Sequence, residues 1–232
     1  MLIDHITALF VSPTSDPLFH LTFGDYGIDV TWYVIGRSIG RIAFPIFAFL
    51  IAEGYFYTKD LKKYILRLSV FAVLSEIPYY YALCFDPVTG LSVDRRNIMF
   101  TLLLGLLAIA VLDTIHQRFM NQMLKNLMSV ATIIGFSFLL IFIKGSYLEF
   151  GYGVLLMIGF YFGHYSKKTT LLLFILLVGF LRGGIEFMAI LAAPFIYFYN
   201  GKKGPSLKYA FYAFYPVHLL VLYGINVFLT KN

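Results

Sequence analysis

The chain has 232 residues, of which 60% are hydrophobic and 13% are charged. Soluble globular domains carry roughly 45–50% apolar and about 25% charged residues, so the composition excludes an ordinary soluble domain. The single cysteine, Cys84, excludes an intrachain disulfide and implies no metal site. The formal charge of +6 reflects basic residues gathered in loops between apolar runs, so we expect a lipid partner and no nucleic-acid partner.

Apolar runs recur along the whole chain, and a helix needs about 20 mostly apolar residues to span a bilayer. We therefore predict an all-α, polytopic transmembrane helix bundle that forms a single domain over residues 1–232, with about nine spans (eight to ten). The first and seventh runs are short, and Pro78 predicts a kink or early exit in the third. Segment 12–31 is predicted to be a loop that caps the outer face. The candidate spans are residues 1–11, 32–54, 65–84, 97–114, 127–143, 149–164, 169–181, 185–199 and 209–229.

Charges in the loops between these spans alternate from one side to the other. One set of loops is mostly basic, with Lys59, Lys62, Lys63, Arg67, Arg118, Lys125, Lys167, Lys168, Lys202, Lys203 and Lys208. The other set carries most of the acidic residues, which are Asp16, Asp25, Asp29, Asp86, Asp94, Glu149 and Glu186. By the positive-inside rule the basic set is cytoplasmic, which predicts a multi-pass protein with its N-terminus inside and its C-terminus outside.

Two histidines are predicted to lie within the membrane. Asp4 and His5 are neighbours in the first run, where the carboxylate could orient the imidazole and raise its basicity. Equally, both could lie in an interfacial first turn, where the helix dipole favours Asp4. His218 follows Tyr215 and Pro216 about half way along the last run, so it is either a proton acceptor or a satisfied core residue.

Four further charges lie in or beside the second and third runs. Arg37 and Arg41 are four residues apart and share a helix face, which suits phosphate or carboxylate recognition. The alternatives are a structural pair with Glu76 or an outer-loop aspartate, or snorkelling to the interface. Glu76 needs at least an arginine partner, and Glu53 is either functional or an interfacial charge.

Asn97 and Thr101 are four residues apart at the start of the fourth run, where interhelical hydrogen bonding is the simplest role. The sequence contains no glycine-rich phosphate loop, no metal-ligand cluster and no serine nucleophile elbow. Buried His, Asp, Glu and Arg residues together with a basic rim suit proton transfer on an anionic cytoplasmic donor. They fit a transporter equally well.

Residues 40–78, GRIAFPIFAFLIAEGYFYTKDLKKYILRLSVFAVLSEIP, resemble the TraX family. So do LIDHI at 2–6, NIMFTLLLGLLAI at 97–109, YGVLL at 152–156, YNGKKG at 199–204 and KYAFYAFYPVHLL at 208–220, in the same order along nearly the whole chain. That family is named for a membrane acetyltransferase that N-acetylates conjugative pilin, and it is distantly similar to the acyltransferase type 3 families. The resemblance implies a bacterial plasma-membrane acyltransferase that uses cytoplasmic acetyl-CoA as donor substrate and needs no metal.

The resemblance also implies which residues matter. The positions that match the family's pattern are Asp4, His5, Arg41, Glu53, Arg67, Glu76, Asn97, Thr101, Asn200, Tyr215, Pro216 and His218. Members usually have a longer lead-in before the Asp-His pair, which here is either missing or lost to a late start codon.

Two functions follow as hypotheses. In an acyltransferase, His5 or His218 would be the general base, Asp4 would tune it, and arginines would hold the donor's phosphates or the oxyanion. The acceptor would be an amine or hydroxyl of a protein N-terminus, a lipid or a glycan. In a transporter or lipid flippase, the same charges would form a path for a proton or a substrate.

Overall fold

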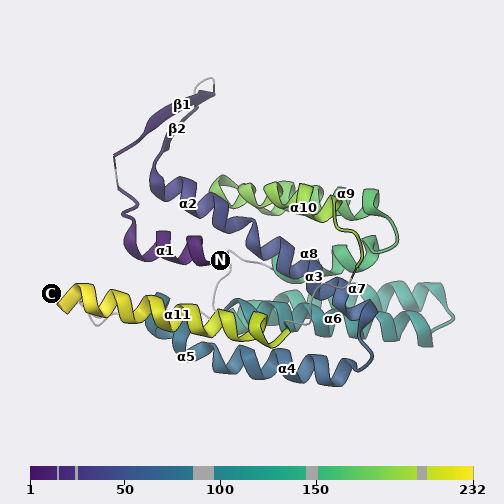
Figure 1. The fold of residues 1–232 in the computed structure, drawn as a ribbon. Helices are drawn as coiled ribbons and strands as arrows, with labels where there is room; N and C mark the ends of the chain where they lie inside the picture. Colours follow the sequence, from purple (N-terminus) through teal and green to yellow (C-terminus); the bar gives the residue numbers. More distant parts are fainter. Residues whose placement is uncertain (15, 24–25, 86–96, 145–150, 203–207, 232) are drawn as a thin grey trace.

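The computed structural model describes residues 1–14, 16–23, 26–85, 97–144, 151–202 and 208–231, and helices dominate this part of the chain (Figure 1). The elements are α1 (Leu2–Phe10), β1 (Phe19–Phe23), β2 (Tyr26–Val30), α2 (Trp32–Arg41), α3 (Ala43–Tyr57), α4 (Leu61–Leu74), α5 (Glu76–Tyr79), η1 (Tyr80–Cys84), α6 (Ile98–Arg118), α7 (Gln122–Lys144), α8 (Tyr152–Gly163), α9 (Lys167–Leu181), η3 (Gly184–Ala192), α10 (Ala193–Tyr197) and α11 (Lys208–Lys231). The predicted helical bundle is confirmed as a class.

Segment 12–31, predicted to be a loop, contains an antiparallel hairpin instead. Phe19 pairs with Val30, and Leu21 pairs with Ile28. Apolar residues alternate with His, Thr, Gly and Asp along both strands, and this period of two is typical of β-strands. The prolines and aspartates of the segment obscured the alternation. The hairpin projects from the end of the bundle where α2 begins (Figure 1).

Four helices in the described part of the chain are long and apolar enough to cross a membrane. They are Trp32–Tyr57, which joins α2 and α3, then Ile98–Arg118, Gln122–Leu139 and Ala210–Leu229. The protein is therefore membrane-like in character. Many large apolar side chains also remain exposed, such as Val73, Phe180 and Phe228, as expected for a surface that faces lipid.

The other predicted spans are helical but shorter or less regular. Helix α8 has 12 residues, which correspond to about 18 Å at 1.5 Å per residue, against a hydrocarbon core of about 30 Å. The third predicted span changes from α4 to α5 at Ser75 and then becomes the π-helix η1, so the irregularity predicted at Pro78 occurs there. The eighth consists of the 3-10 helix η3 followed by α10.

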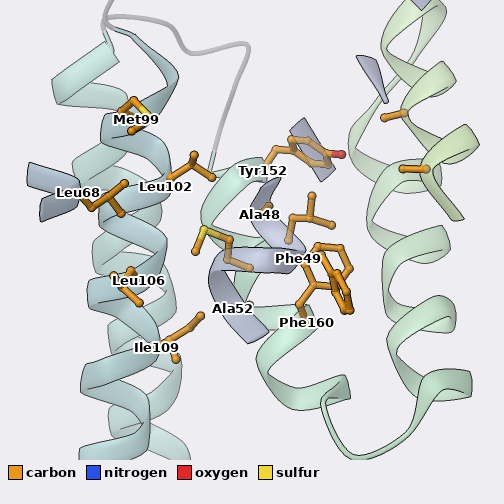
Figure 2. Packing of buried hydrophobic residues seen from close by; sticks show 14 of the residues in the cluster. Ala48, Phe49, Ala52, Leu68, Met99, Leu102, Leu106, Ile109, Tyr152 and Phe160 are labelled. Atoms are coloured by element: carbon orange, nitrogen blue, oxygen red, sulfur yellow. The ribbon is translucent and has the colours of Figure 1, made fainter. Parts of the chain in front are cut away.

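The core forms where α3 lies between α6 and α8 (Figure 2). Ala48 and Ala52 of α3 are fully buried there, and Phe49 meets Phe160 of α8 edge to face with ring centroids 5.3 Å apart. On α6, Gly105 faces Met157 so closely that no Cβ would fit. Small residues bring the helix backbones together, which is how membrane helices gain packing energy without a hydrophobic driving force.

The basic turns gather at one end of the bundle. The α3–α4, α6–α7 and α8–α9 turns lie at that end, while the hairpin and the C-terminus lie at the other (Figure 1). Asp60 caps α4 there, and the Lys63 backbone N–H that it accepts lowers the pKa of its carboxyl. The exposed basic residues of this end are Lys59, Lys62, Lys63, Arg118, Lys167, Lys168 and Lys202. Asp25, Asp86, Asp94, Arg95, Arg96, Glu149 and Lys203 lie outside the described residues.

Candidate functional site

His5 of α1 and His218 of α11 are 213 positions apart in the chain and form a hydrogen-bonded pair. His5 Nδ1 lies 2.8 Å from His218 Nε2, and the two rings are within 1° of parallel. Both side chains are buried. Tyr215, one turn before His218, meets both rings edge-on. The two candidate bases predicted from the sequence therefore belong to one site.

A backbone contact sets the direction of this hydrogen bond. His218 Nδ1 lies 2.7 Å from the Phe214 carbonyl oxygen, which can only accept, so Nδ1 carries the hydrogen. The Nε2 of a neutral His218 is then an acceptor, and His5 Nδ1 must donate to it. A neutral His5 consequently keeps its Nε2 unprotonated. No residue in the described part of the chain hydrogen-bonds that atom, so His5 Nε2 is the nitrogen available to take a proton.

Asp4 does not orient His5, contrary to the role considered for it from the sequence. Its carboxylate contacts Arg37 Nη1 at 2.7 Å and Arg41 Nη2 at 3.8 Å. Arg41 also reaches Glu186 of η3 at 3.2 Å. The two arginines that would otherwise repel on one helix face are therefore separated by a carboxylate. Asp4 and Glu186 are therefore the acidic partners that the structure describes for these two arginines.

Glycines allow α1 to approach α2 closely enough for this contact. A Cβ at Gly40 would overlap the Asp4 side chain, and one at Gly36 would overlap Thr7. We expect Gly40→Ala to displace Asp4 and to lower the free energy of unfolding of the purified protein by about 1–3 kcal/mol, the usual cost of overpacking. Gly135→Ala is the control, because an added Cβ there meets no atom and Ala favours the helix. Equal stability of the two variants would contradict this packing.

A small cavity adjoins the ion pairs, and we call it the arginine cavity. It has a volume of about 90 Å³, and its polar lining residues are Arg41, Thr101, Tyr152, Arg182 and Glu186. Arg182 lies over the Tyr152 ring, with its guanidinium carbon 4.1 Å from the centroid. Of these residues, Arg41 and Thr101 were predicted as site residues, and the structure brings them together.

Glu76 and Asn97 form a separate, structural contact. The Asn97 side chain donates to Glu76 Oε2 and to the Ala72 carbonyl, and its oxygen accepts the Met99 N–H at the start of α6. Asn97 is fully buried and connects α4, α5 and α6. Interhelical hydrogen bonding, the simplest role considered for it, is what the structure shows.

We expect Asn97→Ala to destabilise the protein by about 2–4 kcal/mol, because it removes a helix cap and leaves buried partners unpaired. Thermal unfolding in detergent measures this change. Asn121→Ala is the matched control, since Asn121 caps α7 in the same way with an exposed side chain. A loss no larger than the control's would contradict the role of Asn97 as a connection between helices.

The remaining predicted residues lie toward the basic end. Glu53 is buried, and its Oε1 lies 2.7 Å from Nδ1 of His164, whose ring stacks on Phe56 at a centroid distance of 3.7 Å. The position of His164 at the edge of an apolar run predicts a surface residue, and its partly buried contact with Glu53 corrects that prediction. Asn200 makes a local turn by accepting the Lys202 N–H. Arg67 lies over Tyr64 of its own helix and does not line the arginine cavity.

Several site residues were not predicted from the sequence. Tyr152, Arg182 and Glu186 complete the arginine cavity, and Asp113 accepts hydrogen bonds from Tyr55 and Tyr161 near the basic end. Asp113 and Glu186 could have been found as ionisable residues in or beside apolar runs. Tyr152 had no such signal, because a tyrosine at the start of an apolar run is typical of an interfacial belt.

The site and the fold together define a helical membrane protein with a buried histidine pair beside partly buried ion pairs. The family described as "TraX protein" matches residues 1–226, and the chain belongs to this TraX family. A Dichelobacter nodosus protein described as "Probable fimbrial assembly protein FimC, serogroup H1" is 29% identical to this chain over an alignment of 255 residues, gaps included. The alignment covers 99% of this chain and 92% of that protein. No solved structure matches the chain.

Proposed function

We propose that this protein is a membrane-bound acyltransferase that transfers acetyl from cytoplasmic acetyl-CoA to an amine or hydroxyl of a membrane or surface acceptor. The observation that carries the proposal is the directed hydrogen bond between His5 and His218, which leaves His5 Nε2 as a proton acceptor. A positioned base of this kind contributes about 10²–10⁴-fold to the rate of a proton-transfer step.

Acetyl transfer in this site needs a single base, His5. His5 Nε2 takes the proton of the acceptor as the acceptor's nitrogen or oxygen attacks the thioester carbonyl. The new N–C or O–C bond forms, the C–S bond breaks, and the proton passes to the departing thiolate. His218 is a positioning residue that accepts from His5 Nδ1, and Arg37 and Arg41 supply positive charge near the base.

The basic end suits the donor. Its exposed lysines and Arg67 would attract the donor's phosphates. His218 lies ten residues after Lys208, the first residue of α11, and therefore about 15 Å along that helix from this end. The acetyl group must reach this depth along the bundle to meet the base.

The proposal includes an orientation of the protein in the membrane. We place the basic end in the bacterial cytoplasm by the positive-inside rule, with about nine crossings, the N-terminus inside and the C-terminus outside. The shorter helices would cross where the bilayer thins or where other helices cover their ends. Reporter fusions in the turns 58–60 and 182–183 should report opposite sides of the membrane.

A first acceptor follows from the relative, whose description names fimbrial assembly. The N-terminal amine of a pilin subunit is therefore the first candidate. The test is transfer of labelled acetyl from acetyl-CoA by purified protein to pilin and to membrane fractions. Labelled product that depends on the protein supports the proposal. No transfer to any fraction, together with no binding of acetyl-CoA, would overturn it.

The second candidate is a transporter or lipid flippase. The arginine cavity favours it, because a substrate bound there would lie on the far side of the bundle from the basic end. The cavity is at the start of α8, about 18 Å from the basic turn that ends this helix. A transporter would move substrate across sealed vesicles without acetyl-CoA, and an acyltransferase would not.

A further inference from the structure

The arginine cavity holds polar atoms that the protein itself does not satisfy. Among the residues that the structure describes, Arg41 Nε, Thr101 Oγ1, the Tyr152 hydroxyl and Arg182 Nε are buried and meet no partner in hydrogen-bonding geometry, although the Arg182 guanidinium lies against Tyr152. Thr101 is 2% exposed and Tyr152 is 4% exposed, so neither side chain reaches bulk solvent. Buried donors are normally paired, and four unpaired ones lining one cavity indicate that a ligand completes them.

All four atoms can donate a hydrogen bond. Two belong to guanidinium groups, whose planar arrangement of donors matches carboxylate and phosphate oxygens. The two hydroxyls add donors from α6 and α8, the helices that face each other across the cavity. The set therefore favours an acceptor of hydrogen bonds with several oxygens.

The charges of the cavity do not cancel. Arg41 and Arg182 contribute two positive charges, and Glu186 contributes one negative charge. Asp4 lies 3.8 Å from Arg41 but is held mainly by Arg37, at 2.7 Å. Among the residues that the structure describes, no carboxylate lies within 4.0 Å of Arg182, whose contact is the Tyr152 ring. Among the described residues this leaves one positive charge of the cavity without a carboxylate partner at a partly buried site, and this excess favours an anionic ligand.

Size limits what the anion can be. The volume of about 90 Å³ is far below the roughly 300–1,000 Å³ of pockets that enclose drug-sized ligands. It accommodates one functional group of a few heavy atoms and cannot enclose the nucleotide of acetyl-CoA. Gly153 lines the cavity, and a Cβ there would overlap Thr101 and Phe44, so a side chain at this position would displace residues of the cavity wall.

The cavity is connected to the histidine pair. Arg41 lines the cavity and also reaches Asp4, the residue before His5. The cavity lies at the opposite end of α8 from the basic turn that suits the donor. A group bound here would approach His5 from the side away from the donor.

We infer that the arginine cavity binds a compact oxyanion, a carboxylate or phosphate group, and that this group belongs to the acceptor whose amine or hydroxyl lies next to His5. The second part of this inference rests on the proposed acyl transfer. The first part concerns binding alone. Acceptors that carry an anionic group close to their nucleophile are therefore the substrate class selected by this cavity.

Binding is tested without any reaction. Purified protein in detergent is titrated with sodium phosphate or sodium acetate, and thermal unfolding is compared with sodium chloride at equal ionic strength. We expect at least one of the two oxyanions to raise the melting temperature of the wild type in a saturable way. Thr101→Val and Arg182→Gln should weaken this response about tenfold or more, and Thr101→Val preserves the shape of the side chain.

Arg118→Gln is the matched control, because it makes the same change at an exposed arginine on the helix that carries Thr101. It should respond as the wild type does. His5→Ala should also keep the response, since His5 does not line the cavity. A wild type that neither oxyanion stabilises beyond chloride, or an Arg182→Gln variant that responds normally, would overturn the inference.

The acceptor is tested with two amines that differ only in their anionic group, ethanolamine and phosphoethanolamine. In the labelled-acetyl assay, we expect a KM about tenfold lower for phosphoethanolamine with the wild type, and equal KM values with Arg182→Gln. Free inorganic phosphate should compete with phosphoethanolamine only. Equal KM values with the wild type would overturn the acceptor assignment and leave the binding result standing. Anion binding without any acetyl transfer would instead refute the proposed function.

Discussion

Replacing His5 should abolish most acetyl transfer, and replacing His218 should cost less. We expect His5→Gln to lower kcat by about 10²–10⁴-fold, because it removes the only nitrogen of the pair that is available to take a proton. His218 acts through His5, and loss of such an orienting partner usually costs about 10–100-fold. The measurement is the initial rate of labelled-acetyl transfer at saturating acetyl-CoA.

Two substitutions at His218 test whether it positions His5 rather than acting as a base itself. In His218→Gln, the side-chain oxygen can still accept from His5 Nδ1 and should restore part of the rate, whereas His218→Leu cannot. His116→Gln is the control, since His116 makes the same contact to the carbonyl four residues earlier, at 2.8 Å, within α6. Equal losses in His5→Gln, His218→Gln and His218→Leu would show that His218 is not a positioning residue.

Asp4→Ala should destabilise the fold by about 3–5 kcal/mol. Asp4 forms a salt bridge with Arg37, and the two side chains are only 15% and 20% exposed, respectively. Removing one member of a buried pair leaves the other charge uncompensated. Thermal unfolding of the purified protein measures the loss. Asp60→Ala, at an exposed helix cap, should cost much less than Asp4→Ala.

A double-mutant cycle separates this pair from general damage at the α1–α2 contact. Asp4→Asn and Arg37→Gln should each destabilise the protein, and the double variant should be less destabilised than the sum of the two. Strict additivity would mean that the ion pair contributes nothing. Arg41 should tolerate the loss of Asp4 better than Arg37 does, because it keeps Glu186 at 3.2 Å.

Features that depend on neighbouring residues, such as helices and helix faces, were predicted correctly more often than contacts between residues far apart in sequence. Helices at nearly all of the apolar runs followed from composition and run length. The shared helix face of Arg37 and Arg41 followed from helical periodicity, and an acidic partner was one of the roles considered for the pair. Which acidic group it is did not follow, because Asp4 and Glu186 come from α1 and η3, far from α2 in sequence.

By itself the sequence determined a helical, membrane-like protein with basic turns and with ionisable residues within its apolar runs. It also identified His5, His218, Arg41 and Thr101 singly, because each stands out against an apolar background. Only the tertiary structure decided which of them meet. The pairing of His5 with His218 depends on α1 packing against α11, and its direction depends on the Phe214 carbonyl. The arginine cavity likewise requires α2, α6, α8, α9 and η3 to converge, since close approach of the helix backbones is set by packing across the whole bundle rather than by any local pattern.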